Sequence, residues 1–129
     1  MTDEIRLTIP GEGDFQRIAH LVVGGLAVRL DVTFENLEDI HLALDGLLER
    51  CPDDRELTVT VRVREDELET SIGPFPPGVL RRELERESAD GVGLRRVLET
   101  VTDDFDVADR GDEEWASLRK RLRRVARDD

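Results

Sequence analysis

Apolar and polar residues alternate in five short stretches of the chain, which is the pattern of a strand with one buried face. The stretches are residues 5–9, 57–63, 68–72, 105–107 and 115–118. Glu65 and Asp66 separate the second stretch from the third, so these two predict a β-hairpin. A turn around Gly111 joins the last two predicted strands.

Elsewhere, apolar residues recur at every third or fourth position, which predicts helices. The first helix is expected to run from Asp14, which can cap it, to about Leu30. Its predicted buried stripe consists of Phe15, Ile18, Ala19, Val22, Leu26 and Leu30. Gly24 and Gly25 weaken the middle of this helix by about 1 kcal/mol each relative to alanine. Their presence indicates close packing against a neighbouring helix or strand.

A second helix is predicted to begin at Thr33 or Asn36 and to end before Pro52. Acidic residues in its first turn are favoured there by the helix dipole. A third helix covers residues 94–101, with apolar residues on one face.

The order of these elements predicts an α+β fold. Residues 73–78 hold three prolines and two glycines and are expected to form a loop, whereas residues 79–87 form either a short charged helix or a mobile lid. Strands do not alternate with helices as they do in a parallel sheet. The order favours a two-layer sandwich with helices on one face of the sheet. We expect one domain over residues 1–122 and a charged tail over residues 123–129.

Composition and charge exclude several classes of function. The 129 residues are 38% hydrophobic and 39% charged, and the formal net charge is −12. Broad nucleic-acid binding is not expected, because phosphates would be repelled. The single Cys51 excludes an internal disulfide and a multi-cysteine zinc site. Neither a membrane span nor a signal region is visible, so a soluble cytoplasmic protein is expected.

The usual catalytic sets are missing from the sequence. His20 and His41 lie on different predicted helices without a metal-ligand spacing, and Cys51 has no histidine arranged beside it. Gly91 and Gly93 precede a helix, and two such glycines let backbone N–H groups approach an anion. This pattern alone is weak, and no strand precedes it as a dinucleotide fold would require.

The order of elements and one motif together resemble a known family. Residues 90–107, which begin with Asp90, Gly91, Val92, Gly93 and Leu94, look like a glycine box that starts a helix and leads into a strand. Residues 37–44 are similar to the start of an asparagine-box helix. The chain thus resembles the RsbW/SpoIIAB-type anti-sigma factor kinases, within the ATPase superfamily of histidine kinases and Hsp90.

This resemblance implies a Bergerat-type fold with a mixed, mostly antiparallel sheet. It also implies a nucleotide phosphate site at Gly91, Gly93 and Leu94, and ATP and Mg²⁺ as cofactors of an active member. Members bind a sigma factor or a STAS-domain antagonist, and they often form homodimers. Arg17 lies where their first helix commonly carries an arginine used in partner docking.

Two positions of the second helix depart from the family. When residues 37–44 are aligned with the family's asparagine-box helix, Gly46 stands at the position of the catalytic glutamate. Arg50 then stands at the position of the asparagine that holds magnesium. Glycine cannot take a proton. Asp45 points about 100° away around the helix, and Glu49 also points elsewhere. We therefore expect neither a catalytic base nor a metal ligand, although Arg50 could contact a phosphate directly.

The adenine-binding motif is also altered. The family places an aspartate after the strand, where this chain has Pro74 followed by Phe75. Proline cannot accept the adenine amino hydrogen, and Phe75 is expected to fill the pocket. Loss of a charged buried contact of this kind weakens binding by about 1.5–3 kcal/mol.

Three functions remain in view. The favoured one is a non-catalytic, anti-sigma-factor-like regulator, a pseudokinase in a partner-switching pathway that needs no cofactor. Its docking surface would lie on the first helix at Arg17, His20 and Arg29. The alternative is an active serine/threonine protein kinase that uses ATP and Mg²⁺ on a STAS-type antagonist. The third is a small-molecule sensor with a pocket lined by Phe75 and Val92.

The C-terminal end is basic in an otherwise acidic chain. Its basic residues are Arg119, Lys120, Arg121, Arg123, Arg124 and Arg127. We expect a fraying segment that partly offsets the acidic body. The other interpretation is a contact for an acidic partner or a second subunit.

Overall fold

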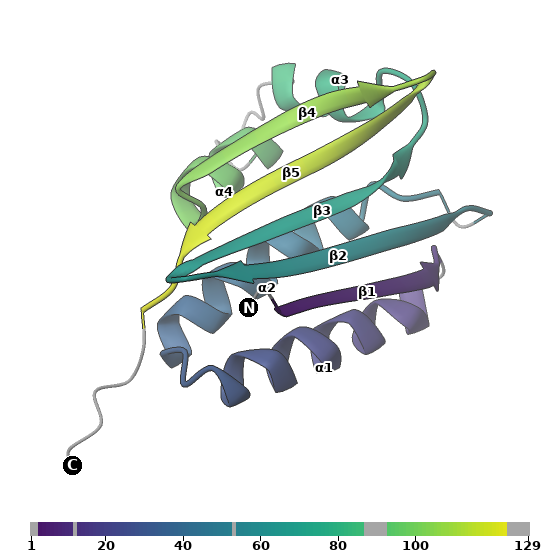
Figure 1. The fold of residues 1–129 in the computed structure, drawn as a ribbon. Helices are drawn as coiled ribbons and strands as arrows, with labels where there is room; N and C mark the ends of the chain where they lie inside the picture. Colours follow the sequence, from purple (N-terminus) through teal and green to yellow (C-terminus); the bar gives the residue numbers. More distant parts are fainter. Residues whose placement is uncertain (1–2, 12, 53, 87–92, 124–129) are drawn as a thin grey trace, which may run out of the picture.

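The computed structural model describes residues 3–11, 13–52, 54–86 and 93–123. Its elements follow the predicted order (Figure 1). They are β1 (Asp3–Pro10), α1 (Gly13–Arg29), α2 (Phe34–Leu48), β2 (Glu56–Arg64), β3 (Glu67–Phe75), α3 (Val79–Glu85), α4 (Leu94–Val101), β4 (Asp104–Arg110) and β5 (Glu113–Arg121). The α+β fold expected from the sequence is confirmed. No helix among these described ranges is both long and apolar enough to cross a membrane.

The strands form one five-stranded sheet in the order β1-β2-β3-β5-β4. A mixed, mostly antiparallel sheet was expected, and every strand pair of the described sheet is antiparallel. The helices gather on one side of it, with α1 beside β1, α2 behind β2 and β3, and α4 against the edge strand β4 (Figure 1). The result is the predicted two-layer arrangement.

The core lies between the sheet and the helices. Along β2, every second residue is buried, from Leu57 to Val63, whereas the residues between them are only partly covered. Leu44, Leu47 and Leu48 of α2 are also buried. Full burial of each such side chain stabilises the fold by about 1.5–3 kcal/mol. Thr33 caps α2, because its Oγ1 accepts a hydrogen bond from Asn36 N at 3.3 Å.

The predicted stripe of α1 is partly wrong. Ala19 is buried as expected, but Ile18 is 40% exposed. Val23 and Ala27 are buried in the middle of the helix. The helix also begins at Gly13, so Asp14 lies in its first turn and is not the cap.

The segment after the hairpin is more regular than expected. β3 continues through Gly73 and Pro74 and ends at Phe75, although residues 73–78 were predicted to form a loop. Phe75 pairs with Glu114 of β5 after an irregularity in the register. Residues 79–87 were predicted to be a helix or a lid, and α3 confirms the helix up to Glu85.

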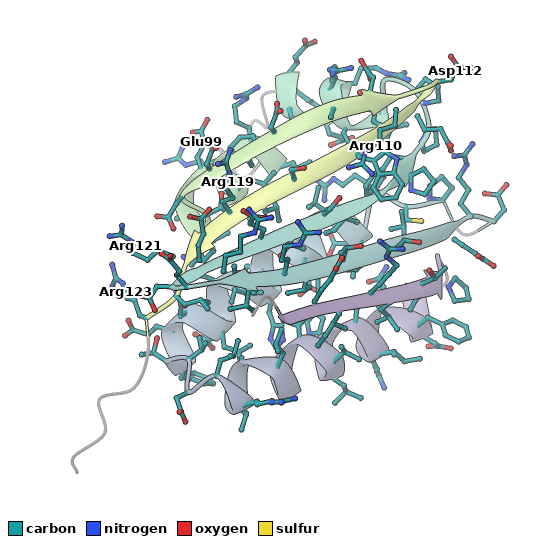
Figure 2. All side chains as sticks on the ribbon, viewed as in Figure 1. Glu99, Arg110, Asp112, Arg119, Arg121 and Arg123 are labelled. Atoms are coloured by element: carbon teal, nitrogen blue, oxygen red, sulfur yellow. The ribbon has the colours of Figure 1, made fainter. Side chains whose placement is uncertain are left out.

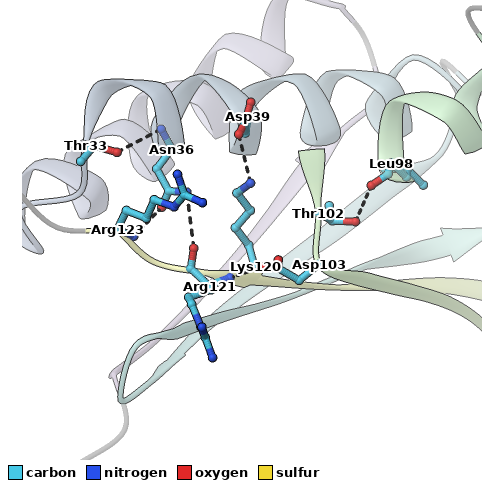
Figure 3. A network of polar contacts seen from close by, with 9 residues as sticks. All are labelled: Thr33, Asn36, Asp39, Leu98, Thr102, Asp103, Lys120, Arg121 and Arg123. Carbon is cyan, nitrogen blue, oxygen red and sulfur yellow. Dashed lines mark hydrogen bonds and ion pairs between the residues drawn. The ribbon is translucent and has the colours of Figure 1, made fainter. Parts of the chain in front are cut away.

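Residues 119–123 of the basic C-terminal segment are held by contacts with the rest of the fold. Lys120 Nζ contacts Asp39 Oδ2 at 3.0 Å, and Arg119 contacts Asp104 at 2.9 Å. Asn36 accepts a hydrogen bond from Arg123 N at 3.1 Å (Figure 3). The prediction that residues 119–123 fray is therefore wrong, because β5 and these contacts hold them. Arg124 and Arg127 lie outside the described residues.

Candidate functional site

The position expected for a catalytic base lies where α2 packs on α4. A Cβ added to Gly46 would lie 3.2 Å from Leu94 Cδ1, which is tighter than an ordinary contact. Leu94 itself is buried at the beginning of α4. Glycine thus lets the two helices approach closely, and the space beside this position is filled by an apolar side chain.

Arg50 ties the end of α2 to α3. Its Nη1 donates a hydrogen bond to the carbonyl oxygen of Gly46 at 2.8 Å and lies 3.3 Å from Glu49 Oε2. Its Nη2 lies 3.6 Å from Glu83 Oε2 on α3. The side chain is only 24% exposed. The guanidinium therefore occupies the position expected for a metal ligand and is engaged by neighbouring oxygens.

The carboxylates near Gly46 face other partners. Asp45 contacts the ring of His20 on α1, and Glu49 contacts Arg50. Asp45 is therefore engaged with α1, and Glu49 is engaged with the neighbouring arginine. In the part of the chain that the structure describes, no group of three or more His, Cys, Asp or Glu residues could hold a metal ion.

Gly93 begins α4 without a side-chain cap. Its carbonyl accepts a hydrogen bond from Val97 N at 3.1 Å, so the first helical turn is formed. Leu94 follows directly and points into the core. Gly91, the other predicted phosphate-site glycine, lies outside the described residues, as does Val92.

The altered adenine motif lies at the end of β3. A Cβ added to Gly73 would overlap the Trp115 ring of β5, so this glycine allows the ring to lie against the strand. Phe75 is fully buried in the core. The ring therefore belongs to the core and offers no surface to the small molecule considered from the sequence.

Leucine side chains fill the space beneath α3. They are Leu47, Leu80, Leu84, Leu94 and Leu98, and all are buried. The gap that they line admits no water-sized molecule. Arg95 Nε also donates a hydrogen bond to the carbonyl of Leu84 at 2.9 Å, which fastens α4 to α3.

Glu114 is a buried carboxylate that the sequence analysis missed. It is 1% exposed, and its Oε1 accepts a hydrogen bond from Leu80 N at 2.8 Å. Arg81 Nη1 lies 3.4 Å from its Oε2 and donates a hydrogen bond to Asp109 at 2.6 Å. The bond to Asp109 raises the pKa of Arg81. The signal was present in the sequence, because Glu114 shares its strand face with Ala116 and Leu118.

The predicted docking residues separate in the structure. Arg17 is exposed on α1, as expected. His20 instead faces α2, where it contacts Asp45 and stacks on His41 with ring centroids 4.3 Å apart. His20 therefore takes part in helix packing and keeps a 32% exposed side chain, and its role in partner docking stays a prediction.

The exposed large apolar side chains of the described residues all lie on the first two helices. They are Ile18, Leu21, Val28, Phe34 and Leu42. Isolated exposed apolar residues are common on protein surfaces, and here they are found on the helical layer of the fold. Arg17 lies within the same face of α1.

Comparisons with known proteins agree with this architecture. No protein-family model matches the chain. The serine-protein kinase RsbW of Listeria monocytogenes serotype 4a is 27% identical, over 81% of this chain and 78% of the relative. The same protein of Listeria innocua is 26% identical over the same shares.

One solved structure is also similar, a crystal structure of the RsbU and RsbW domains of a Mycobacterium tuberculosis protein. It has a TM-score of 0.70 and 14% identity, and the match covers 97% of this chain. The chain spans only 33% of that longer protein. This likeness shows the fold.

Proposed function

The chain is related to the RsbW-type anti-sigma factor kinases, and from this premise we propose that it is a non-catalytic member that regulates by binding other proteins. It would hold a sigma factor or a STAS-domain antagonist in a partner-switching pathway. Its nucleotide site would be degenerate, and it would need no cofactor.

Two residues of α2 and its C-terminal end, Gly46 and Arg50, carry the proposal. Gly46 has no side chain that could accept a proton. A Cβ added to it would lie 3.2 Å from Leu94 Cδ1, so the neighbouring space is already filled. Arg50 brings a positive charge to the position expected for a metal ligand. A bare unit charge 4 Å from another like charge costs about 4 kcal/mol at an effective dielectric of 20, and a divalent ion doubles this. The carboxylates of Glu49 and Glu83 beside Arg50 offset part of this cost. Magnesium binding at this position is therefore disfavoured.

The end of β3 supports the same conclusion. Pro74 has no side-chain group that can accept a hydrogen bond from adenine. Phe75 is fully buried, and the leucines beneath α3 fill the adjoining space. Base recognition and metal binding would thus be weakened on separate elements of the fold.

Partner docking would use the outer face of α1. This face combines the exposed Arg17 with apolar side chains such as Leu21, which is 75% exposed. If docking occurs there, Arg17→Glu will weaken partner capture. His20→Gln changes a residue that packs between helices, so it should leave partner capture unchanged. Equal capture by the wild type and Arg17→Glu would place docking elsewhere.

Nucleotide binding separates this proposal from its alternative, an active serine/threonine protein kinase. The alternative draws on the relatives' names and on Gly93, whose helix begins without a side-chain cap. An active kinase binds ATP, so its free energy of unfolding should rise by about 2.7 kcal/mol when the ATP concentration is 100 times the dissociation constant. We expect no rise in Tm with ATP and Mg²⁺, and no phosphate transfer to a STAS-domain protein. A clear rise in Tm together with transfer would support the kinase.

A further inference from the structure

A hollow of about 780 Å³ lies on the face of the sheet that is turned away from the helices. Along β2, every second residue is buried against the helices, so Thr58 and Thr60 face the other way and line the hollow. Arg110 and Arg119, which are labelled along β4 and β5 in Figure 2, line it as well. Its volume falls in the range of sites for small molecules, which is about 300–1,000 Å³.

Hydroxyl groups run across the middle of the hollow. Thr60 of β2 pairs in register with Ser71 of β3, and Ser71 pairs with Ser117 of β5. All three residues line the hollow, and we call them the hydroxyl row. Ser71 Oγ is shielded from solvent and has no hydrogen-bond partner among the described residues. The row thus holds hydrogen-bonding capacity that the fold itself does not use.

The charged side chains around the hollow are mostly basic. Four arginines line it against two glutamates, Glu4 and Glu69. The arginines are Arg6, Arg62, Arg110 and Arg119. This local balance of +2 is found in a chain whose formal net charge is −12. The hollow therefore attracts a small anion that the acidic chain as a whole repels.

Arg110 is held in a position that suits such an anion. Its guanidinium carbon lies 4.6 Å from the centroid of the Trp115 ring. The ring in turn lies against Gly73, where an added Cβ would overlap it. Among the described residues, no carboxylate forms an ion pair with Arg110, whereas the other three arginines each contact one. A guanidinium stacked on an aromatic ring keeps its N–H donors available, and their fork matches two oxygens of a phosphate.

We propose that this hollow binds a small molecule that bears a phosphate group. Arg110 donates hydrogen bonds to two phosphate oxygens, and hydroxyls of the hydroxyl row donate to the remaining oxygen. The hollow lies on the opposite face of the sheet from Gly46 and Arg50, so this inference does not rest on the proposed function.

Isothermal titration calorimetry of the full chain at constant ionic strength tests the proposal with three probes: inorganic phosphate, glucose 6-phosphate and glucose. We expect saturable binding of the phosphate-bearing probes, with a dissociation constant of about 1 mM or lower, and no binding of glucose. The emission of Trp115, the single tryptophan, should change over the same concentrations, because Arg110 lies over its ring. Tighter binding of glucose 6-phosphate than of inorganic phosphate identifies the ligand as a phosphate ester, and equal binding identifies it as the free ion.

A pair of arginine variants locates the site. Arg110→Gln should raise the dissociation constant of glucose 6-phosphate by about tenfold or more, because it removes the charged fork. Arg110 is exposed, so the fold should be unchanged by circular dichroism. Arg64→Gln is the matched control, because it removes the same charge from an exposed arginine of β2 that does not line the hollow.

Three results would overturn the proposal. One is the absence of saturable binding by both phosphate-bearing probes. Another is binding of glucose as tight as that of glucose 6-phosphate, which would mean that the hollow recognises the sugar and not the phosphate. The third is an equal loss of affinity in Arg64→Gln and Arg110→Gln, which would reduce the effect to the overall charge of the chain.

Discussion

The imidazole ring of His20 on α1 stacks on that of His41 on α2, with centroids 4.3 Å apart and planes inclined by 12°. His41 Nε2 also lies 3.3 Å from the carbonyl oxygen of His20. The carboxylate of Asp45 on α2 contacts Nε2 of the His20 ring. The contact between the first two helices therefore includes two titratable rings and one carboxylate.

This pair makes stability depend on pH. Burial lowers the pKa of His41 below 6.5 and the neighbouring His20 lowers it further, against smaller opposing effects of its backbone hydrogen bond and of Asp45. Below about pH 6.5, the unfolded chain takes up a proton at His41 more readily than the folded chain does. The free energy of unfolding should therefore fall as the pH drops from about 7.5 to about 5.5.

Urea denaturation at several pH values measures this slope. His41→Gln cannot take up the proton and should show a shallower loss of stability over the same range. An identical slope in the wild type and in His41→Gln would contradict the assignment of the effect to this ring.

Glu114 holds the beginning of α3 against β5, and its removal should be costly. Glu114→Ala would leave Leu80 N without its acceptor and open a void in the core, for an expected loss of about 2–4 kcal/mol. Glu113→Ala is the matched control, because Glu113 is half-exposed and pairs with Arg55 at 3.1 Å. Such a surface pair contributes at most about 1 kcal/mol. Equal losses in urea denaturation would show that Glu114 has no special role.

The approach of Trp115 to Gly73 gives a prediction that fluorescence can follow. Gly73→Ala would place a Cβ in the tryptophan ring, so we expect a loss of about 1–3 kcal/mol as the ring moves. Trp115 is the single tryptophan of the chain, so its emission should shift to longer wavelength as its exposure increases.

The control for this variant is Gly24→Ala. Its added Cβ would lie 4.0 Å from His41 Nε2, an ordinary contact within a helix. Stability should rise by up to about 1 kcal/mol through helix propensity. If Gly73→Ala were as stable as the wild type, the ring would not depend on this glycine.

Periodicity alone predicted most of the fold. The alternation along β2 and the helical spacing of apolar residues along α2 are local patterns. The structure buries every second residue of β2 from Leu57 to Val63, and it buries Ile40, Leu44 and Leu47 of α2. β3 was predicted too short, because Gly73 and Pro74 are typical of loops. Its last residues are instead held by pairing with β5, a strand about 40 residues further along the chain. Such pairing is a tertiary effect that local chemistry does not reveal.

The polar contacts were harder to predict than the core. The stacking of His20 on His41 joins residues 21 positions apart, and no local pattern connects them. Lys120 was expected in a solvated segment, but β5 turns it toward Asp39 on α2. Both contacts depend on which helix lies against which strand. The assignment of Gly46 to the position of the catalytic base, by contrast, rests on the sequence register alone and stays a prediction.

Asn36 joins the beginning of α2 to the end of β5, and this junction tests whether the basic segment is held in place. The side chain is 4% exposed and contacts the backbone of both Arg121 and Arg123 (Figure 3). The labelled side chains of Arg121 and Arg123 lie at the end of the sheet where the chain leaves it (Figure 2). The amide thus donates to the carbonyl of Arg121 and accepts from the backbone N–H of Arg123.

Asn36→Ala should therefore destabilise the fold by about 1–3 kcal/mol, since it removes a buried side chain that bonds the backbone at two points. Proteolysis at Arg121 and Arg123 should also become faster, because the end of β5 would detach more often. Glu35→Ala is the control, because Glu35 is exposed on the same helical turn. A variant as stable and as protease-resistant as this control would mean that β5 pairing alone holds the segment.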